Sequence, residues 1–194
     1  MSRIITISRE FGSGGRLIGK MAAERLGIPC YDEELIPRIA KKTGISEEDV
    51  RERGEYAHGI RWNQGILTTV DFRGRSAMDA LWKAQSGLIL EIARQGQDCV
   101  IIGRCADYLL RERADLLRVF IHAPMEFRIR QITEFYHIRD AAPERLLKDR
   151  DKRRSSYYKY YTDLKWGEMS NYDLVLNSAT LGLERCADAV AGLF

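Results

Sequence analysis

Long apolar runs are absent from this sequence of 194 residues. A helix that crosses a bilayer needs about 20 mostly apolar residues, and no stretch of even ~18 occurs, so we expect no membrane-spanning segment and no membrane partner. The first residues run straight into an apolar, β-branched stretch, so we also expect no signal peptide.

Cysteine and histidine are sparse, with four and three residues respectively. No two cysteines form a C-x-x-C pair, and Cys30 and Cys99 lie in apolar runs. This usage indicates buried free thiols in a reducing compartment, so we expect a cytoplasmic protein. The histidines are scattered and lack the spacing of metal ligands. No residue can therefore be assigned as a metal ligand from the sequence.

Excess charge is confined to one segment. The net charge is +3, and residues 139–154 alone carry seven basic against four acidic residues, so the rest of the chain is neutral overall. A protein that binds duplex nucleic acid usually spreads basic residues over more of its surface. We therefore expect no nucleic-acid partner, because a local basic cluster suits a small anionic ligand better.

Short apolar runs alternate with helical patterns along the chain. The runs are continuous, which indicates strands buried on both faces, as in a parallel sheet covered by helices. With right-handed crossovers, this order predicts an α/β three-layer sandwich around a mainly parallel five-stranded sheet. The strands are expected at residues 4–7, 28–31, 99–102, 117–121 and 174–176. The helices are expected at residues 17–26, from Glu33, from a capping box at Ser46, at 77–94, from Pro124, from Pro143 and at 183–194.

A glycine-rich turn separates the first predicted strand from the first long helix. Glycines let backbone N–H groups point at a phosphate, and the helix N-terminus adds positive potential, so the turn predicts an anion site. A turn that binds nothing is the alternative. The residues expected to hold the anion are Arg9, Gly12, Ser13, Gly14, Gly15 and Arg16.

The turn departs from the full P-loop pattern, G-x-x-x-x-G-K-[ST]. Of the four specified positions only Gly14 matches, because Arg9, Gly15 and Arg16 stand where glycine, lysine and a hydroxyl residue are required. The lysine would neutralise the transferring phosphates and the hydroxyl would hold Mg²⁺. Arg9 or Arg16 can supply the positive charge instead, and Ser13 is the hydroxyl that remains.

Two segments carry a resemblance to a known family: S-R-E-F-G-S-G-G at residues 8–15, and the stretch from Y-Y-K-Y-Y at 157–161 to Y-D-L-V-L-N at 172–177. Nearly end to end, the chain resembles the cytidylate kinase-like family, a divergent branch of the P-loop nucleoside monophosphate kinases. In that branch the missing lysine looks like a family trait. The resemblance implies a P-loop kinase fold, a nucleotide as small-molecule partner, ATP as phosphoryl donor, and Mg²⁺.

The resemblance also implies the acceptor-binding residues. Ordinary cytidylate kinases carry an aspartate at the end of the second strand, an arginine on the next helix, and glycine-arginine-aspartate after the third strand. Asp32, Arg38 and Arg104 stand at similar places here, although Cys105 replaces the last aspartate. The alternatives are a capping role for Asp32, a solvated Arg38, and an ordinary salt bridge for Arg104.

The basic segment resembles the phosphate-clamping lid of those enzymes. Arginine suits phosphate because its planar fork donates two hydrogen bonds and keeps its charge. We expect Arg150 and Arg153 to bind substrate, and Arg16, Arg150 and Arg154 to act in catalysis. The alternative is a charged, exposed helix with i,i+3 and i,i+4 carboxylate partners.

Residues 1–194 are interpreted as one domain. Within it, residues 55–75 lack a clean period and predict an acceptor-side loop or lid, and residues 139–166 predict the basic lid. The tyrosines at 157–161 predict a packing surface, an oligomer contact or a base-stacking platform, so a homo-oligomer is one expectation. Asp107 is interpreted as an ordinary helix carboxylate, with metal binding as its alternative.

These observations predict a kinase that transfers the γ-phosphoryl group of ATP to a small acceptor, first of all cytidine monophosphate or its deoxy form. Two alternatives stay open. The degenerate loop is compatible with a nucleotide- or phosphate-binding protein without catalysis, such as a sensor or assembly partner. The residues are equally compatible with a kinase for another small metabolite.

Overall fold

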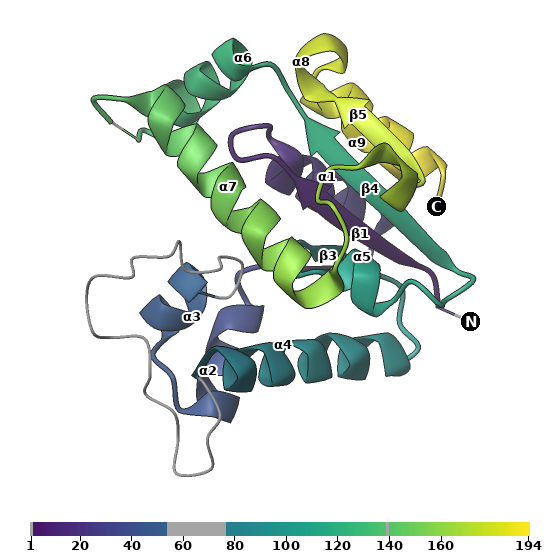
Figure 1. Ribbon diagram of the computed structural model, residues 1–194. Helices are drawn as coiled ribbons and strands as arrows, with labels where there is room; N and C mark the ends of the chain where they lie inside the picture. The colour runs from purple at the N-terminus through teal and green to yellow at the C-terminus, as the bar shows by residue number, and fades with distance from the viewer. Residues whose placement is uncertain (1, 54–76, 139) are drawn as a thin grey trace.

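The computed structural model describes residues 2–53, 77–138 and 140–194. Its centre is a sheet of five strands, all parallel, in the order β2-β3-β1-β4-β5 (Figure 1). This confirms the predicted five-stranded parallel sheet. The strands are β1 (Ile4–Arg9), β2 (Cys30–Tyr31), β3 (Cys99–Ile102), β4 (Leu116–His122) and β5 (Leu174–Asn177).

Both faces of the sheet are covered by helices, because successive residues of a strand point to opposite faces. Ile4 and Ile101 pack on one side with α2 (Leu35–Thr43) and α4 (Ala77–Arg94). Ile5 and Val100, the neighbours of those residues in β1 and β3, pack on the other side. There they meet α1 (Gly15–Leu26) and α9 (Leu183–Gly192). The fold is therefore the predicted three-layer sandwich.

The remaining helices connect these layers. Some were predicted from caps and prolines, and α3 indeed begins with the Ser46 hydroxyl accepting from the Asp49 amide at 3.1 Å. The helix expected from Glu33 begins two residues later. Several short elements had no signal, because four or five residues are too few to show a period. The connecting helices are α3 (Glu47–Arg53), α5 (Ala106–Leu109), α6 (Met125–Arg130), a π-helical turn η1 (Gln131–Phe135), α7 (Pro143–Thr162), a 3₁₀ turn η2 (Met169–Asn171) and α8 (Ser178–Leu181).

Helix α7 contains most of the predicted basic lid and lies across the fold in Figure 1. One face of α7 is buried, with Leu147, Arg154, Tyr157 and Tyr158 among its buried residues. The helix is therefore packed against the rest of the fold along one face, and is not a fully solvated charged helix. The other predicted lid, residues 55–75, lies outside the described residues.

The four cysteines are all free thiols, as predicted, although Cys30 is only half-buried. Burial raises the pKa of Cys30 to about 12 and that of Cys99 to about 11, so both thiols stay protonated. Within the described parts of the chain, no helix combines the length and apolar character needed to cross a membrane.

Candidate functional site

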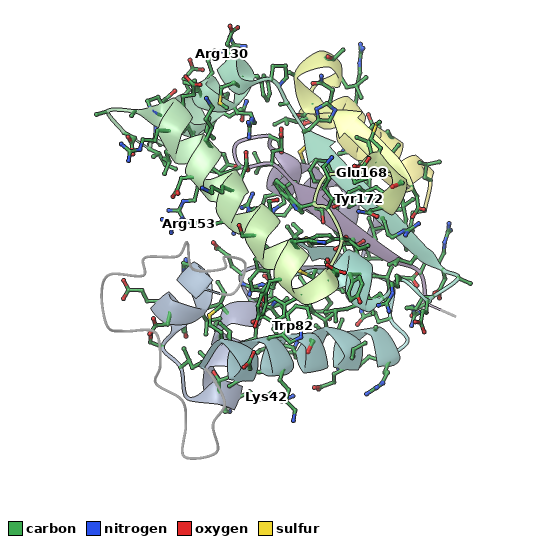
Figure 2. The ribbon with its side chains drawn as sticks, viewed as in Figure 1. Lys42, Trp82, Arg130, Arg153, Glu168 and Tyr172 are labelled. Atoms are coloured by element: carbon green, nitrogen blue, oxygen red, sulfur yellow. The ribbon has the colours of Figure 1, made fainter. Side chains whose placement is uncertain are left out.

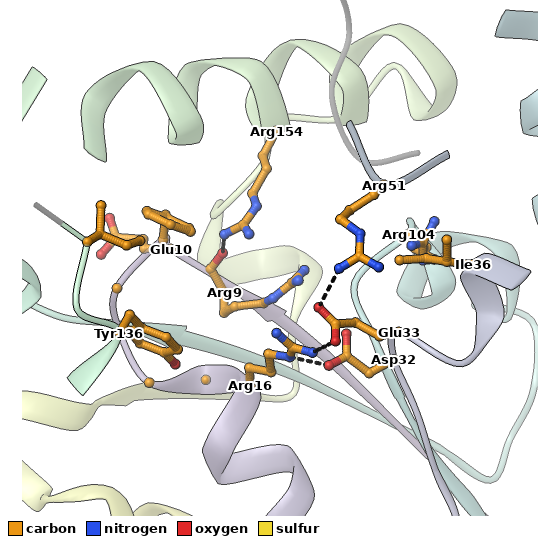
Figure 3. Close-up of a pocket in the computed structure, with 15 residues that line it drawn as sticks. Arg9, Glu10, Arg16, Asp32, Glu33, Ile36, Arg51, Arg104, Tyr136 and Arg154 are labelled. Carbon is orange, nitrogen blue, oxygen red and sulfur yellow. Dashed lines mark hydrogen bonds and ion pairs between the residues drawn. The ribbon is translucent and has the colours of Figure 1, made fainter. Parts of the chain in front are cut away.

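A cavity of about 300 Å³ opens at the carboxyl ends of the first three strands, where the glycine-rich turn lies (Figure 3). Ligands of open α/β sheets bind at this edge. Its described lining combines five arginines, three carboxylates and a few apolar or aromatic side chains. The charged lining residues are Arg9, Arg16, Arg51, Arg104, Arg154, Glu10, Asp32 and Glu33.

Two glycines shape the turn that forms one wall of this cavity. Gly14 has φ +76° at the N-cap of α1, a left-handed conformation that is strained for other residues. A Cβ on Gly15 would lie 2.6 Å from the Cβ of Arg9, so only glycine allows α1 to begin this close to β1. Gly14, Gly15 and Arg16 line the cavity, so the N-terminus of α1 lies on its wall, and the helix dipole there favours an anion.

Ser13 lies inside the turn and does not line the cavity. Its side chain is fully buried, and its hydroxyl donates to the Glu10 carbonyl at 2.9 Å and accepts from the Gly15 amide. Its own carbonyl accepts from the Ser178 hydroxyl at 2.6 Å. These bonds hold the turn in shape. The predicted contact of Ser13 with a ligand stays a prediction, and in this structure its side chain is turned into the turn and away from the cavity.

Arg16 joins the glycine turn to the opposite wall of the cavity. Its guanidinium donates to Asp32 and lies 2.7 Å from a Glu33 oxygen, while Arg51 lies 3.7 Å from the other Glu33 oxygen (Figure 3). Burial alone would favour the neutral guanidine, but the bonds to Glu33 and Asp32 outweigh it and raise the pKa of Arg16. The hydrogen bond from Arg16 also lowers the pKa of Glu33. Arg16 and Asp32 were predicted on the donor and acceptor sides, and the structure brings them into direct contact.

Arg104 is a buried cation on the cavity wall. It is 7% exposed and has φ +59°, a conformation that is uncommon for residues other than glycine. Its guanidinium donates to the Gln85 side-chain carbonyl at 2.7 Å, and it forms no ion pair with the described residues. A buried charge without an opposite charge is costly. Arg104 is therefore well suited to an anionic ligand.

Arg154 approaches the cavity from α7. It is 9% exposed, and it donates to the Arg9 carbonyl at 3.1 Å. Its guanidinium lies 5.5 Å from the centre of the Phe11 ring, at cation–π distance. The structure thus brings together Arg9, Arg16, Arg104 and Arg154, four arginines that the sequence predicted as site residues.

Three other predicted arginines do not line the cavity. Arg38 is exposed on α2, because Leu35, Ile36 and Ile39 occupy the buried face. Arg153 is exposed on α7 (Figure 2) and forms an i,i+4 ion pair with Asp149 at 2.9 Å. Arg150 lies 5.8 Å from the centre of the Phe11 ring and is not among the residues that line the cavity. The predicted contacts of these three arginines with a ligand stay predictions.

Sequence reasoning missed the ion pair that holds α7 to the glycine turn. The Asp151 carboxylate accepts from the Phe11 amide at 2.7 Å and pairs with the buried guanidinium of Arg128. Arg128 also lies 3.6 Å from Glu10, whose carboxylate accepts from the Ala123 amide at 3.0 Å. No local pattern reveals this network, because its members come from three distant parts of the chain.

Sequence reasoning also missed several residues of the cavity wall itself. Arg51 reaches the cavity from α3, on the side where Arg38 had been expected. Tyr136 and Ile138 follow the π-helical turn, and Ile36 comes from the buried face of α2. These apolar and aromatic groups give the charged cavity a surface on which a flat ring could rest.

The tyrosine run is mainly a packing element. Tyr157 and Tyr158 are buried, and Tyr161 stacks on Trp82 with ring centres 4.1 Å apart. The Tyr158 hydroxyl donates to Asp107 at 2.7 Å, and burial raises the pKa of that carboxyl. Asp107 is a buried helix carboxylate, and the described residues contain no cluster of three potential metal ligands.

Comparison with known proteins identifies the family. The sequence profile of the cytidylate kinase-like family matches residues 4–180. The chain is 28% identical to the cytidylate kinase of Methanosarcina mazei, over 97% of this chain and 98% of that protein. It is also 28% identical to the cytidylate kinase of Methanocaldococcus jannaschii, over 93% of this chain and 91% of that protein. It spans about half the length of the Halobacterium salinarum cytidylate kinase, at 30% identity over 52% of each.

Solved structures show the same fold. A protein from Eubacterium ventriosum is 24% identical, with a TM-score of 0.75 over 99% of this chain and 98% of that one. A shikimate kinase from Acinetobacter baumannii is 15% identical, with a TM-score of 0.57 over 100% of this chain and 93% of that one. These similarities confirm the predicted P-loop kinase fold, and the resemblance seen in the glycine turn is confirmed by the profile. The chain belongs to the cytidylate kinase-like family.

Proposed function

We propose that this protein transfers the γ-phosphoryl group of ATP to a nucleoside monophosphate, and that CMP or dCMP is the preferred acceptor. Membership of the family supports the reaction class. The observation that carries the proposal is Arg104, a buried guanidinium on the wall of the same cavity that the N-terminus of α1 lines. An acceptor phosphate supplies the opposite charge that the described residues do not give it.

The chemistry needs positioning and charge neutralisation more than covalent participation by the protein. In this proposal the turn amides bind the donor phosphates, and Arg104 binds the acceptor phosphate. Arg154 contacts the turn through the Arg9 carbonyl and lines the same cavity as Arg104. It is therefore placed to neutralise charge on the transferring group, which develops between donor and acceptor. No general base is needed because the acceptor phosphate is already an anion.

Mg²⁺ normally accompanies ATP in such reactions, but the described residues offer it no built site. The Ser13 hydroxyl is buried in the turn, and Arg16 stands where the usual metal-binding hydroxyl would be. Each carboxylate of the cavity is already engaged: Glu10 by Ala123, and Asp32 and Glu33 by Arg16. We therefore assign Mg²⁺ to the donor phosphates and water, which suits an ion that keeps several waters.

The test is a coupled assay of ATP consumption with a panel of nucleoside monophosphates. Arg104→Lys keeps the charge but loses the planar fork, so the acceptor KM should rise roughly 10- to 100-fold while the ATP KM stays the same. Arg185→Lys, at an exposed position on α9, is the matched control. Absence of turnover with every monophosphate, in folded wild-type protein, would refute the proposed reaction.

A second candidate function is nucleotide or phosphate binding without transfer. The observation that favours it is the pairing of Arg16 with two carboxylates, which withdraws part of the charge that the missing lysine would supply. If this candidate holds, ATP should raise the melting temperature of the protein with no ATP consumption in the presence of Mg²⁺ and any acceptor. Turnover with one acceptor excludes it.

A further inference from the structure

A second, smaller cavity of about 20 Å³ adjoins the main one. Arg9, Arg104 and Arg154 line both. The main cavity has carboxylates on its walls, whereas the described lining of the small cavity contains none. A space of this size holds about one water molecule or one oxygen of a larger anion. The small cavity is therefore a corner lined by three arginines, hydroxyl groups and neutral side chains, and none of its described lining residues is an acid.

Gln85 lies behind this corner and fixes the direction of its hydrogen bonds. The side chain is fully buried on α4, and it joins Arg104 to Tyr157. Arginine can only donate, so the carbonyl oxygen of Gln85 must face Arg104, at 2.7 Å. The amide NH₂ then faces the Tyr157 oxygen, at 3.1 Å, and donates to it.

This arrangement determines the role of the Tyr157 hydroxyl. Because its oxygen accepts from Gln85, its own hydrogen is available to donate elsewhere. No described residue accepts that hydrogen, although the side chain is 3% exposed. Burial raises the pKa of Tyr157 well above its ordinary value, so the hydroxyl keeps its proton at neutral pH. An unused donor on the wall of a cationic corner requires an acceptor.

We infer that Tyr157, Arg104 and Arg154 together bind one phosphate oxygen of the acceptor in the small cavity, and that Gln85 is the positioning residue that keeps Tyr157 a donor. This inference rests on the proposed function and adds a residue to its acceptor site. It also explains why a polar residue lies on the buried face of α4, on the same face as Leu81, Leu88 and Ile92.

A purely structural role for Tyr157 makes different predictions. The ring packs edge-on against Trp82 and Tyr161, with centres 6.0 and 4.7 Å away, and phenylalanine would keep both contacts. Tyr157→Phe should therefore fold normally. If the hydroxyl binds the acceptor phosphate, the acceptor KM rises roughly 10- to 100-fold, as expected for one hydrogen bond to a charged group, and the ATP KM is unchanged.

The control is Tyr160→Phe, which removes the same hydroxyl from the same helix at a position 73% exposed. Its acceptor KM should equal that of the wild type. Direct titration of each protein with CMP gives a second readout that requires no turnover. Equal CMP affinity and equal acceptor KM for Tyr157→Phe and the wild type would overturn the inference.

Gln85→Glu tests the positioning role. A carboxylate accepts from Arg104 as the amide does, but it cannot donate to Tyr157, so the Tyr157 hydroxyl turns to donate to it. Both donors are then withdrawn from the corner, and the acceptor KM should rise at least as much as in Tyr157→Phe, with little change in the ATP KM. Adding Tyr157→Phe to Gln85→Glu should raise the acceptor KM little further, because the Tyr157 hydroxyl already donates to the introduced carboxylate.

The failure of this inference can be told apart from failure of the proposed function. If the wild type turns over a monophosphate and the Tyr157 and Gln85 variants match it in acceptor KM, the proposed function stands. The inference that Tyr157 binds the acceptor phosphate in the small cavity is then refuted. If the wild type turns over nothing but binds CMP, weaker CMP binding by Tyr157→Phe still supports the corner and equal binding refutes it. If the wild type neither turns over nor binds any monophosphate, both are refuted.

Discussion

The Nε atom of Arg16, in the first turn of α1, donates to the Asp32 carboxylate at the end of the second strand. The family resemblance assigns Asp32 to the acceptor, and the glycine turn assigns Arg16 to the donor. In the proposed function, one ion pair would therefore connect the donor side and the acceptor side of the cavity. Its side chains are 32% and 10% exposed, so the interaction is only partly screened by solvent.

Asp32→Asn should strengthen donor binding. The substitution keeps the shape of the side chain but removes the charge that competes with phosphate for Arg16, which then retains Glu33 alone. A partly exposed ion pair contributes about 1 kcal/mol, so the Kd for ATP should fall roughly fivefold. Titration calorimetry with ATP measures this directly. The acceptor KM should rise at the same time because a predicted acceptor contact is lost.

Glu33→Gln is the companion variant. Glu33 is 49% exposed, so its charge is better screened and the gain in ATP affinity should be smaller than with Asp32→Asn. If Asp32→Asn instead weakens ATP binding, then the ion pair orients Arg16 toward the donor rather than withdrawing it, and the competition argument is wrong.

Asp151→Asn should destabilise the fold. The carboxylate pairs with Arg128, whose side chain is 7% exposed, and accepts from the Phe11 amide. Removing its charge leaves a buried guanidinium whose one carboxylate neighbour among the described residues is Glu10, 3.6 Å away. Breaking a buried pair in this way costs about 3 kcal/mol, which urea unfolding would measure.

Asp149→Asn is the matched control, two residues earlier on the same helix. Its ion pair with Arg153 joins side chains that are 49% and 47% exposed, so its loss should change the free energy of unfolding by no more than about 0.5 kcal/mol. Similar losses in both variants would mean that the Asp151 pair contributes no more than an ordinary surface contact.

Much of the fold was predictable because its strands are short, continuous apolar runs bounded by clear stops. The β1 run and the run Cys99–Ile102 are buried on both faces. Runs this apolar are stable in a folded chain only where they are shielded from water. The glycine turn was predictable for the same local reason, since Gly14 and Gly15 meet backbone and steric demands that other residues cannot. These features depend on neighbours in sequence.

The site was predictable only in part. Arg104 and Arg16 lie next to predicted strand ends or the turn, so their place followed from the fold. Arg38 lies outside the cavity, because the apolar positions 35, 36 and 39 turn it toward solvent, as in the alternative given for it. Gln85 was overlooked despite lying on the apolar face of its helix. The Arg128–Asp151 pair had no signal, because contacts between residues of distant segments depend on how helices pack and not on local spacing.

Gly15→Ala should disrupt both the fold and the turn. The added Cβ would lie 2.6 Å from the Cβ of Arg9, and the backbone of β1 holds that atom in place. Overpacking of this kind costs about 1–3 kcal/mol and shifts the turn, so the free energy of unfolding and any ATP binding should both decrease. Thermal and urea unfolding provide the first measurement, and ATP titration provides the second.

Gly87→Ala provides the opposite result as a control. Gly87 lies within α4, and a Cβ there would meet no atom within 4 Å. Alanine favours the helix, so the free energy of unfolding of this variant should rise by about 0.5–1 kcal/mol. If both glycine variants are destabilised alike, the close approach of α1 to β1 is not what requires glycine at position 15.

The pair formed by Asp173 and Arg118 should make stability depend on pH. Asp173 accepts from the Arg118 side chain at 2.6 and 3.1 Å and from its amide at 2.8 Å, and the hydrogen bond from the side chain lowers the pKa of Asp173. An acid whose pKa is lowered by folding stabilises the protein fully above its unfolded pKa, near 3.9. That stabilisation is lost as the pH falls through the folded pKa.

Asp173→Asn should therefore be about 1 kcal/mol less stable than the wild type at pH 7, a modest value because the side chains are 36% and 31% exposed. The difference should stay constant down to about pH 4 and shrink at lower pH, where the wild-type carboxylate is protonated too. Urea unfolding of both proteins between pH 7 and about pH 3 measures it, and high salt should reduce it at neutral pH. A difference that widens as the pH falls would contradict the lowered pKa.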